Sequence, residues 1–251
     1  MRLSGIKRIA NRASILFRGR LACYDVALSL VTNRAGLEIG GPSAVFRERF
    51  APLPIYGQVA SLDNCNFSPT TVWATHADSY TFSSRKAPGR IIISDASDLA
   101  CVADASYDFI LSSHNLEHIA NPVKAIKQWQ RVTRPRGGLI LVLPDHTKTF
   151  DHRREPTTVE HMLADFDQDT QEDDLTHLSE ILELHDLSMD PQAGSPEHFR
   201  QRSLDNFTNR CLHHHVFNQT NSRLLLSRLG MTVLAVESVP PHHIFLLARM
   251  P

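Results

Sequence analysis

The chain has 251 residues, of which 42% are hydrophobic and 21% charged, and its formal net charge is −1. These values suit a soluble globular protein with one sizeable core, and the balanced charge gives no reason to expect a nucleic-acid partner. The four cysteines form no C-x-x-C pair and no run of 18 apolar residues occurs. The sequence therefore disfavours a zinc knuckle, a disulfide framework and a transmembrane helix, and a cytoplasmic location is expected.

Residues 1–34 are predicted to form a basic helical segment ahead of the main domain. Six Arg or Lys residues and no acid precede Asp25. The apolar positions of this segment fit one face of an amphipathic helix packed on the domain. The same pattern suits a transit peptide or a peripheral membrane contact through residues 1–22, so both interpretations stay open.

From residue 35 onward, short apolar runs alternate with helical patterns. The runs are nearly continuously apolar, as in parallel strands that are covered on both faces. They span residues 35–40, 57–64, 90–98, 107–115 and 138–145. Residues 121–135 predict a helix before the fifth run, because Asn121 is a good N-cap and Pro122 fits the first turn. This order predicts an α/β fold with a doubly wound, Rossmann-like sheet of seven strands.

The C-terminal residues are expected to complete that sheet. A helix is predicted over 220–230 and two strands over 231–239 and 243–250. Residues 35–145 and 216–251 are accordingly assigned to one domain.

Residues 146–215 break the alternation and are interpreted as an acidic helical insertion after the fifth strand. No Lys or Arg occurs between Arg154 and Arg200, whereas Asp and Glu are frequent there. Helices are predicted over 157–166, 175–187 and about 199–211. Because ligands bind beyond the carboxyl ends of the strands in such sheets, the insertion is expected to act as a lid or as an acceptor-selecting wall.

The first predicted strand runs into a glycine turn within AGLEIGGPSA, residues 35–44. Gly40 and Gly41 allow the backbone to pass close to a ligand. A pyrophosphate-binding G-x-G-x-x-G would need its second glycine where this chain has Glu38. A carboxylate repels pyrophosphate and attracts an ammonium group, so the turn favours S-adenosylmethionine as the cofactor.

Two further acids follow the next predicted strands. Asp63 lies at the end of the second run, where a carboxylate accepts hydrogen bonds from ribose hydroxyls. Asp95 and the amide of Ala96 follow the third run and are candidates for the edge of an adenine ring. Three consecutive strands therefore end in an acid, which supports a nucleoside-containing cofactor.

Residues 104–145 carry the most specific motif, DASYDFILSSHNLEHIANPVKAIKQWQRVTRPRGGLILVLPD. With the glycine turn, this segment resembles the class I S-adenosylmethionine-dependent methyltransferases, in particular the methyltransferase type 11 branch. The resemblance covers roughly residues 35–145 and 216–250. Pro42 and Ala44 replace the later glycines of that family's first motif.

The resemblance implies roles for residues at matching positions. The cofactor-binding residues would be Glu38, Gly40, Gly41, Asp63, Asp95, Ala96, Ser112 and Ser113. Glu38 and Gly40 would contact the methionine part, and the serines would lie beside the sulfonium. His114, which follows them, is the candidate general base for a hydroxyl acceptor.

The chain has 14 histidines, which is many for its length. His114 and His118 have the spacing of a zinc-binding helix, but Glu117 is misplaced for H-E-x-x-H, and a structural hydrogen bond is the favoured interpretation for His118. The histidines and acids of the insertion could bind a divalent metal or could cap helices and pair with each other. The second interpretation is favoured, so no metal site is predicted.

Acceptor contacts are expected from the insertion. Arg153 and Arg154 could hold a phosphate of the acceptor or form surface salt bridges. The HHH run at 213–215 is expected to face the pocket, with His214 as an acceptor contact.

The inserted motifs TFDHRR…TT…EH and EDDLTHL…HDL point to a substrate class only through resemblance. They resemble bacterial methyltransferases encoded with glycosyltransferases, and the rhizobial enzymes that 2-O-methylate the fucose of nodulation factors. The predicted function is therefore O-methylation of a sugar hydroxyl of a bacterial glycan or lipo-oligosaccharide. Two alternatives stay open: a C- or N-methyltransferase of a small metabolite, and a non-catalytic cofactor-binding partner in a glycan pathway.

Overall fold

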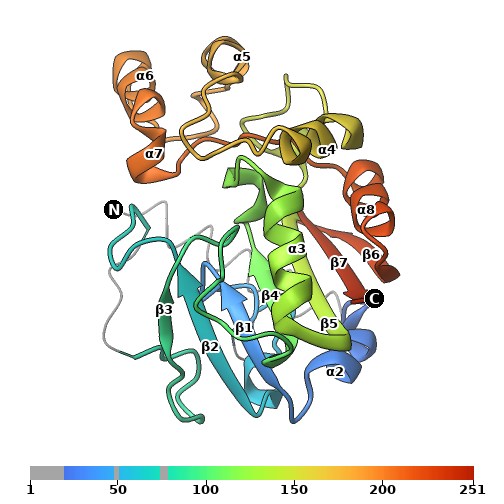
Figure 1. Cartoon of the computed structure of the whole chain (residues 1–251). Coiled ribbons are helices and arrows are strands. Elements are labelled where there is room, and N and C mark those ends of the chain that lie inside the picture. Colours follow the sequence, from blue (N-terminus) through green and yellow to red (C-terminus); the bar gives the residue numbers. More distant parts are fainter. Residues whose placement is uncertain (1–19, 48–50, 74–78) are drawn as a thin grey trace.

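A seven-stranded sheet forms the centre of the computed structural model, which describes residues 20–47, 51–73 and 79–251 (Figure 1). The strand order is β3-β2-β1-β4-β5-β7-β6. β7 runs antiparallel to both of its neighbours, and the other pairs are parallel. The strands are β1 (Ala35–Ile39), β2 (Ser61–Asn66), β3 (Ile91–Ile93), β4 (Tyr107–Ser113), β5 (Thr133–Pro144), β6 (Thr232–Val239) and β7 (His243–Arg249). The predicted α/β fold with seven strands is confirmed.

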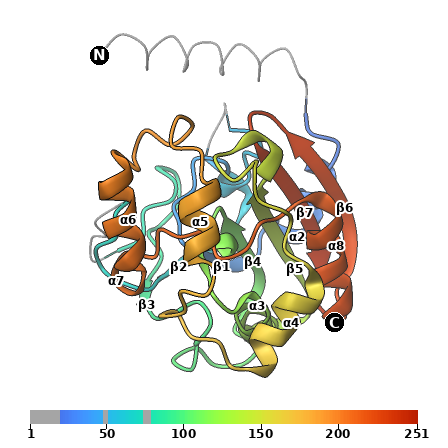
Figure 2. The ribbon, with the colours of Figure 1, turned by 90° about the horizontal axis from the view of Figure 1, so that it is seen from above.

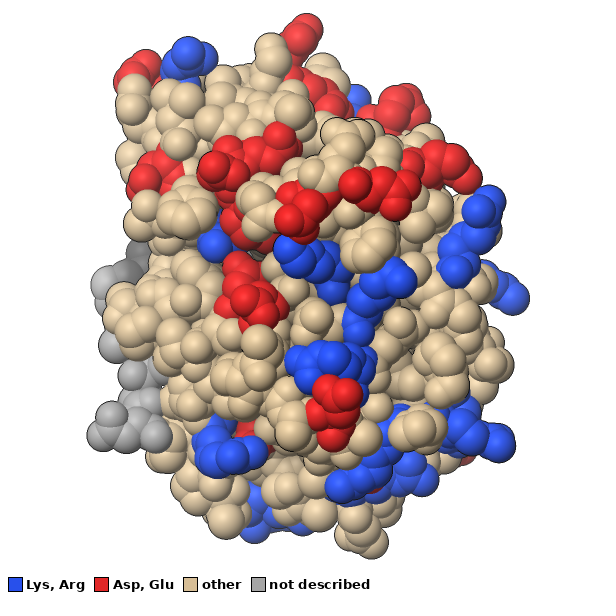
Figure 3. Space-filling model, viewed as in Figure 1, with Lys and Arg blue, Asp and Glu red and all other residues tan. Residues whose placement is uncertain are grey.

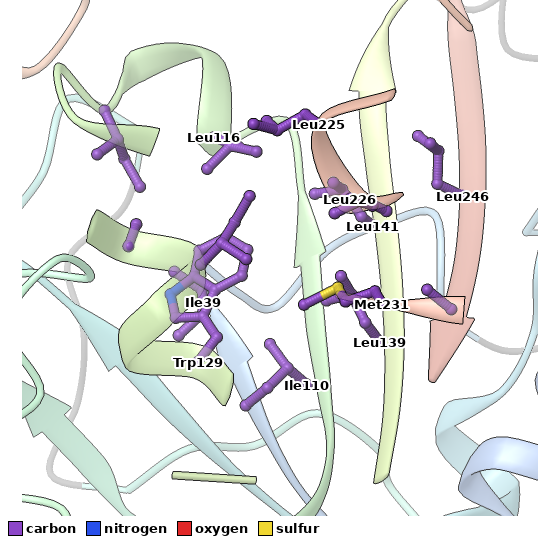
Figure 4. Packing of buried hydrophobic residues seen from close by; sticks show 14 of the residues in the cluster. Ile39, Ile110, Leu116, Trp129, Leu139, Leu141, Leu225, Leu226, Met231 and Leu246 are labelled. Carbon is purple, nitrogen blue, oxygen red and sulfur yellow. The ribbon is translucent and has the colours of Figure 1, made fainter. Parts of the chain in front are cut away.

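Helices cover both faces of this sheet. α3 (Pro122–Val132) and α8 (Gln219–Arg228) pack on one face, and α2 (Tyr24–Val31) packs on the other. The side chains of β4 alternate between the two faces, as a strand with period two requires. Ile110 therefore joins the core beneath α3 and α8, which Figure 4 shows, whereas Phe109 joins the core beneath α2.

Trp129 of α3 is the largest side chain that is fully buried between helix and sheet. Its replacement by alanine is expected to cost about 3–5 kcal/mol, as for other large-to-small changes in protein cores. The indole Nε1 also donates a hydrogen bond to the carbonyl of Ala96, over 3.1 Å. The core thereby fixes the position of the loop that follows β3.

The segment between β5 and α8 lies over the carboxyl ends of the central strands (Figures 1 and 2). Its helices are α4 (Val159–Asp167), α5 (Leu178–Leu184), α6 (Pro196–Leu204) and α7 (Asn206–Asn209). Thr158 and Ser195 cap α4 and α6 by accepting hydrogen bonds from backbone amides. Acidic side chains gather over these helices, whereas Lys and Arg gather around the opposite end of the molecule (Figure 3).

Short 3-10 turns complete the architecture, and two of them border the central strands. These turns are η1 (Tyr56–Gln58), η2 (Leu116–His118) and η3 (His146–Lys148). η1 occupies the start of the second predicted strand, so β2 begins and ends later than expected. The third helix predicted in the insertion is divided into α6 and α7.

The N-terminal predictions are tested only in part. Residues 1–19, including most of the stretch considered for membrane contact, lie outside the described residues. The described remainder of that segment contains α2, whose buried Ala27, Leu30 and Val31 pack on the sheet. Among the residues that the structure describes, no helix is long and apolar enough to span a membrane.

Candidate active site

A cavity of about 410 Å³ lies at the carboxyl ends of the central strands, beneath the inserted helices. Its walls come from the turn after β1, from the residues that follow β2, β3 and β4, and from the insertion. η2 contributes Glu117 and His118, and the insertion contributes Thr149, Phe150, Glu172, Arg210 and His213. Residues more than 170 positions apart therefore meet in one space.

The glycine turn after β1 forms one wall, with Gly40 and Gly41 lining the cavity. Gly40 has a φ of +77°, a backbone conformation that favours glycine. A Cβ atom on Gly41 would lie 2.4 Å from both the carboxyl carbon of Glu38 and the hydroxyl of Tyr80. The turn therefore rests directly on Glu38 and leaves no room there for a side chain.

Glu38 is fully buried beneath this turn and does not line the cavity. The hydroxyls of Tyr56 and Tyr80 donate hydrogen bonds to its carboxylate over 2.7 and 2.5 Å, and the Ser43 amide donates another over 3.1 Å. Desolvation by burial raises the pKa of Glu38 to about 7, although these donors act in the opposite direction. The direct contact of Glu38 with the cofactor stays a prediction; in this structure its oxygens hold the glycine turn in place.

Asp63 also lies outside the cavity, because β2 continues for three residues beyond it. Its carboxylate accepts hydrogen bonds from Arg90 over 2.8 Å and from the hydroxyl of Tyr107 over 2.8 Å. The binding of the ribose by Asp63 therefore stays a prediction, and the contacts of its carboxylate in this structure are structural. Asn66, at the actual end of β2, lines the cavity, and its buried Nδ2 has no hydrogen-bond partner among the described residues. The only sequence signal for Asn66 was a polar residue at the end of an otherwise buried run.

Asp95 and Ala96 line the cavity after β3, where the sequence placed them. Asp95 forms an ion pair with Arg210 of the insertion over 3.2 Å. Arg210 also pairs with Glu172 over 2.5 Å, so one guanidinium joins both carboxylates at this end of the cavity. Burial raises the pKa of Glu172 to about 7.

The residues that follow β4 line the middle of the cavity. Ser113 and His114 reach it, whereas Ser112 is buried in the sheet and does not, so a cofactor contact of Ser112 stays a prediction. His114 has a φ of +50°, an uncommon conformation for a residue with a side chain. Its Nε2 lies 2.7 Å from Nδ1 of His243, and its Nδ1 lies 3.7 Å from the carboxylate of Glu117.

The acid–base state of His243 helps to define the role of His114. Burial lowers the pKa of His243 to about 3, so this imidazole is neutral at physiological pH. A neutral His243 can accept a hydrogen bond at Nδ1 from the Nε2–H of His114. In that tautomer Nδ1 of His114 is unprotonated, and a proton taken up there would lie beside the carboxylate of Glu117.

The acceptor residues predicted in the insertion are not in the cavity. The side chain of Arg154 is buried and pairs with Asp151 over 3.2 Å and with Glu180 over 3.1 Å. Arg153 pairs with Asp186 over 3.0 Å. The acceptor contacts of both residues stay predictions, and in this structure acids of the same region neutralise these cations.

His214 is the third residue predicted to contact the acceptor, and that role stays a prediction. It is buried, and its Nε2 lies 3.0 Å from Nδ2 of Asn206. Burial lowers the pKa of His214 to about 3. The preceding residue, His213, lines the cavity instead. The sequence marked the run of three histidines but did not indicate which ring would face inward.

The cavity wall carries unused hydrogen-bonding capacity. Nδ2 of Asn66, Oγ of Ser113 and Oδ1 of Asn115 are buried and have no hydrogen-bond partner within the described part of the chain. Buried polar atoms of this kind are normally satisfied, so a polar ligand is expected beside them. Together with the close-packed turn at Gly40 and Gly41, they fit a cofactor with amino-acid, ribose and base groups.

A match to the methyltransferase-domain family, together with this fold, identifies an S-adenosylmethionine-dependent methyltransferase with S-adenosylmethionine as its cofactor. The family model of the methyltransferase domain matches residues 37–141, which run from β1 into β5 and include the glycine turn and η2. No curated protein matches the chain.

Solved structures share the fold at low sequence identity. A proposed methyltransferase from Bacillus halodurans is 11% identical, with a TM-score of 0.51 over 92% of this chain and 98% of that one. The 1,6-didemethyltoxoflavin-N1-methyltransferase of Burkholderia thailandensis is 13% identical, with a TM-score of 0.50 over 98% of this chain and 82% of that one. At this identity, the likeness shows the fold alone.

Proposed function

We propose that the protein transfers the methyl group of S-adenosylmethionine to a hydroxyl of a sugar in a bacterial glycan or lipo-oligosaccharide. The observation that carries this proposal is the composition of the acceptor end of the cavity. This end is rich in hydrogen-bonding side chains, and its lining includes Glu117, His118, Thr149, His213 and His242. Such a wall suits an acceptor with several hydroxyl groups better than a flat apolar one.

Trp73 adds support for a sugar ring. It lines the cavity, yet 54% of its surface is exposed, and its ring centroid lies 5.3 Å from that of His118. An exposed indole with a hydrogen-bonding neighbour offers an apolar face and a polar edge together, which matches the two kinds of surface of a sugar ring. We infer that Trp73 supports the acceptor at the cavity mouth.

His114 is proposed as the general base. It lies between the glycine turn and the acceptor end, and its Nδ1 faces the carboxylate of Glu117. When bound, the cofactor supplies an electrophilic methyl group on its sulfonium. Nδ1 of His114 accepts the hydroxyl proton of the acceptor as the new O–CH₃ bond forms and the S–CH₃ bond breaks. The negative charge of Glu117 stabilises the resulting imidazolium.

The narrowest form of the proposal is 2-O-methylation of the fucose of a nodulation factor, in the cytoplasm. Its support is the resemblance of the inserted motifs. The described cysteines are all free, as is usual in a reducing compartment.

The test measures methyl transfer from isotope-labelled S-adenosylmethionine to a panel of acceptors. The panel contains fucosides, other simple glycosides, a fucosylated lipo-chitooligosaccharide, and small metabolites with nitrogen or carbon nucleophiles. The proposal expects transfer to a sugar hydroxyl. Transfer only to nitrogen or carbon would refute the acceptor class. Cofactor binding without transfer to any acceptor would favour the non-catalytic alternative.

Two variants test the assigned roles. His114→Asn keeps a residue that tolerates a positive φ but removes the basic ring nitrogen, so turnover should fall at least about a hundredfold with cofactor affinity unchanged. Trp73→Ala should raise the KM for the acceptor more than it lowers kcat. Unchanged turnover in the first variant would remove His114 from the role of base.

A further inference from the structure

Three potential metal ligands meet in the wall of the cavity, at its acceptor end. Glu117 and His118 belong to η2, and His213 comes from the insertion. One ligand atom of each residue lies within 4.8 Å of the other two. Two imidazoles and one carboxylate on one side of a cavity form a set that can hold a metal ion and leave coordination positions open.

Both histidines are oriented by hydrogen bonds to groups on the far side of their rings. Nδ1 of His118 lies 3.0 Å from the carbonyl of Leu212, and Nδ1 of His213 lies 2.5 Å from the carboxylate of Asp151. A carbonyl or an ionised carboxylate can only accept, so each Nδ1 carries a proton, and in the neutral form of each ring Nε2 has a free lone pair. Metal-binding histidines are oriented in this way.

Arg154 in turn holds Asp151, the carboxylate that orients His213. Asp151 is buried and pairs with the buried guanidinium of Arg154 over 3.2 Å. This pair keeps the carboxylate ionised and fixed, and thereby holds the His213 ring in place. The arginine that the sequence suggested as an acceptor contact thus supports the cluster from outside the cavity.

Glu117 supplies the negative charge. Its side chain is buried, and its Oε2 has no hydrogen-bond partner within the described residues. An ionised carboxylate oxygen left unpaired in a protein interior is costly. In their neutral form the rings of His118 and His213 have no proton on Nε2 to donate to it. Three electron-pair donors therefore converge without a hydrogen between them, which is the arrangement that a cation satisfies.

We propose that Glu117, His118 and His213 form a binding site for one divalent transition-metal ion at the acceptor end of the cavity. Two nitrogen ligands and one oxygen ligand suit Zn²⁺, Mn²⁺, Fe²⁺ or Co²⁺, whereas Ca²⁺ and Mg²⁺ prefer oxygen ligands alone. The open positions of the ion face the cavity, where water or an acceptor oxygen can occupy them. The site departs from the expectation that the histidines serve only as caps and structural partners.

Two other groups of histidines in the described part of the chain are less suited to this role. In one, Nε2 of His114 is engaged with Nδ1 of His243 over 2.7 Å. In the other, which contains His161, Asp165 and His215, Nε2 of His161 is engaged with Nε2 of His177 over 3.0 Å. The ligand nitrogens of the proposed site are free of such contacts.

The test uses the full chain, stripped of metal by a chelator and then titrated with Co²⁺. Binding is followed by the visible absorption bands of the ion, and Zn²⁺ is titrated calorimetrically. One equivalent is expected to bind tightly to the wild type. His118→Ala should weaken this binding at least about a hundredfold, and Asp151→Asn about 10–100-fold through the orientation of His213. His161→Ala, which alters the neighbouring histidine group, is the matched control and should bind as the wild type does.

Cofactor titration of each variant shows whether it is folded, and it reports on the methyltransferase site independently of the metal. Should His118→Ala not fold, Glu117→Gln tests the same site with a smaller change in shape and should also weaken binding. Absence of Co²⁺ and Zn²⁺ binding to wild-type protein that still binds S-adenosylmethionine would overturn the proposal. So would loss of binding in His161→Ala with binding retained in His118→Ala, because the ion would then belong to the other group.

Discussion

The buried carboxyl group beneath the glycine turn is expected to make folding stability depend on pH. The pKa of Glu38 rises from an ordinary value of 4.5 to about 7 in the folded protein. Below about pH 4.5 the group is protonated in both the folded and the unfolded chain, so it contributes no pH dependence. Between the two values only the unfolded chain releases the proton, and rising pH therefore favours unfolding. Above about pH 7 Glu38 is ionised in both the folded and the unfolded chain, and the loss of stability is complete.

These two pKa values set the size of the effect. A difference of one pKa unit corresponds to about 1.4 kcal/mol, so Glu38 should lower the free energy of unfolding by about 2.5 kcal/mol between about pH 5 and about pH 8. Glu38→Gln has no titrating group there, so the difference in stability between wild type and variant should change by that amount. Urea denaturation across this range measures the difference, and the surface substitution Glu183→Gln corrects for the loss of one negative charge. A difference that stays constant with pH would refute a raised pKa at Glu38.

Three further substitutions test the remaining structural assignments. Gly41→Ala places a methyl group against Glu38, so the affinity for S-adenosylmethionine, measured by calorimetry, should fall at least about tenfold, or about 1.4 kcal/mol. Unchanged affinity would show that the turn is not fixed as described. Arg154→Met leaves Asp151 buried without its arginine partner, so the free energy of unfolding, measured by chemical denaturation, should fall by about 3–5 kcal/mol. A fall below about 1 kcal/mol would contradict a buried ion pair. Asp63→Asn should lower the Tm but leave the cofactor affinity within about twofold of the wild type, because the carboxylate of Asp63 pairs with Arg90. A tenfold weaker cofactor affinity would instead support a contact of Asp63 with the cofactor.

The sequence pattern was sufficient for the architecture, because buried parallel strands and capped helices are specified locally. Asn121 accepts the hydrogen bond from Lys124 that its position as N-cap predicts, and α3 begins at the proline that follows it. The order of strands and helices then leaves few topologies open. The ends of the strands were harder to predict from the sequence. β2 begins later than predicted because η1, which contains the buried Tyr56, includes residues that the apolar pattern assigned to the strand.

The candidate site was predictable where it depends on backbone position and less so where it depends on side-chain partners. Gly40, Gly41, Asp95, Ala96 and His114 line the cavity because they follow strands at its edge. Their part in binding or catalysis stays a prediction.

The insertion could not be resolved in the same way, because an irregular chain has no period to indicate which residues face inward. Three consecutive histidines therefore gave no reason to choose His213 over His214. Likewise, nothing in the local sequence indicates that Arg154 is buried against Asp151, which follows η3, and against Glu180 of α5. Such pairings depend on how the insertion folds on itself.

The arginine that joins the insertion to the sheet also affects how ligands exchange. Arg210 lies between Asp95 and Glu172, two carboxylates that would otherwise repel each other across the cavity. Moving α7 away from the sheet would have to separate opposite charges at one point and would leave two like charges facing one another. Mobile ions screen both interactions, so the rate at which ligands enter and leave this end of the cavity should depend on ionic strength. Arg210 thus links the ionic strength of the surroundings to the exchange of ligands at the cavity.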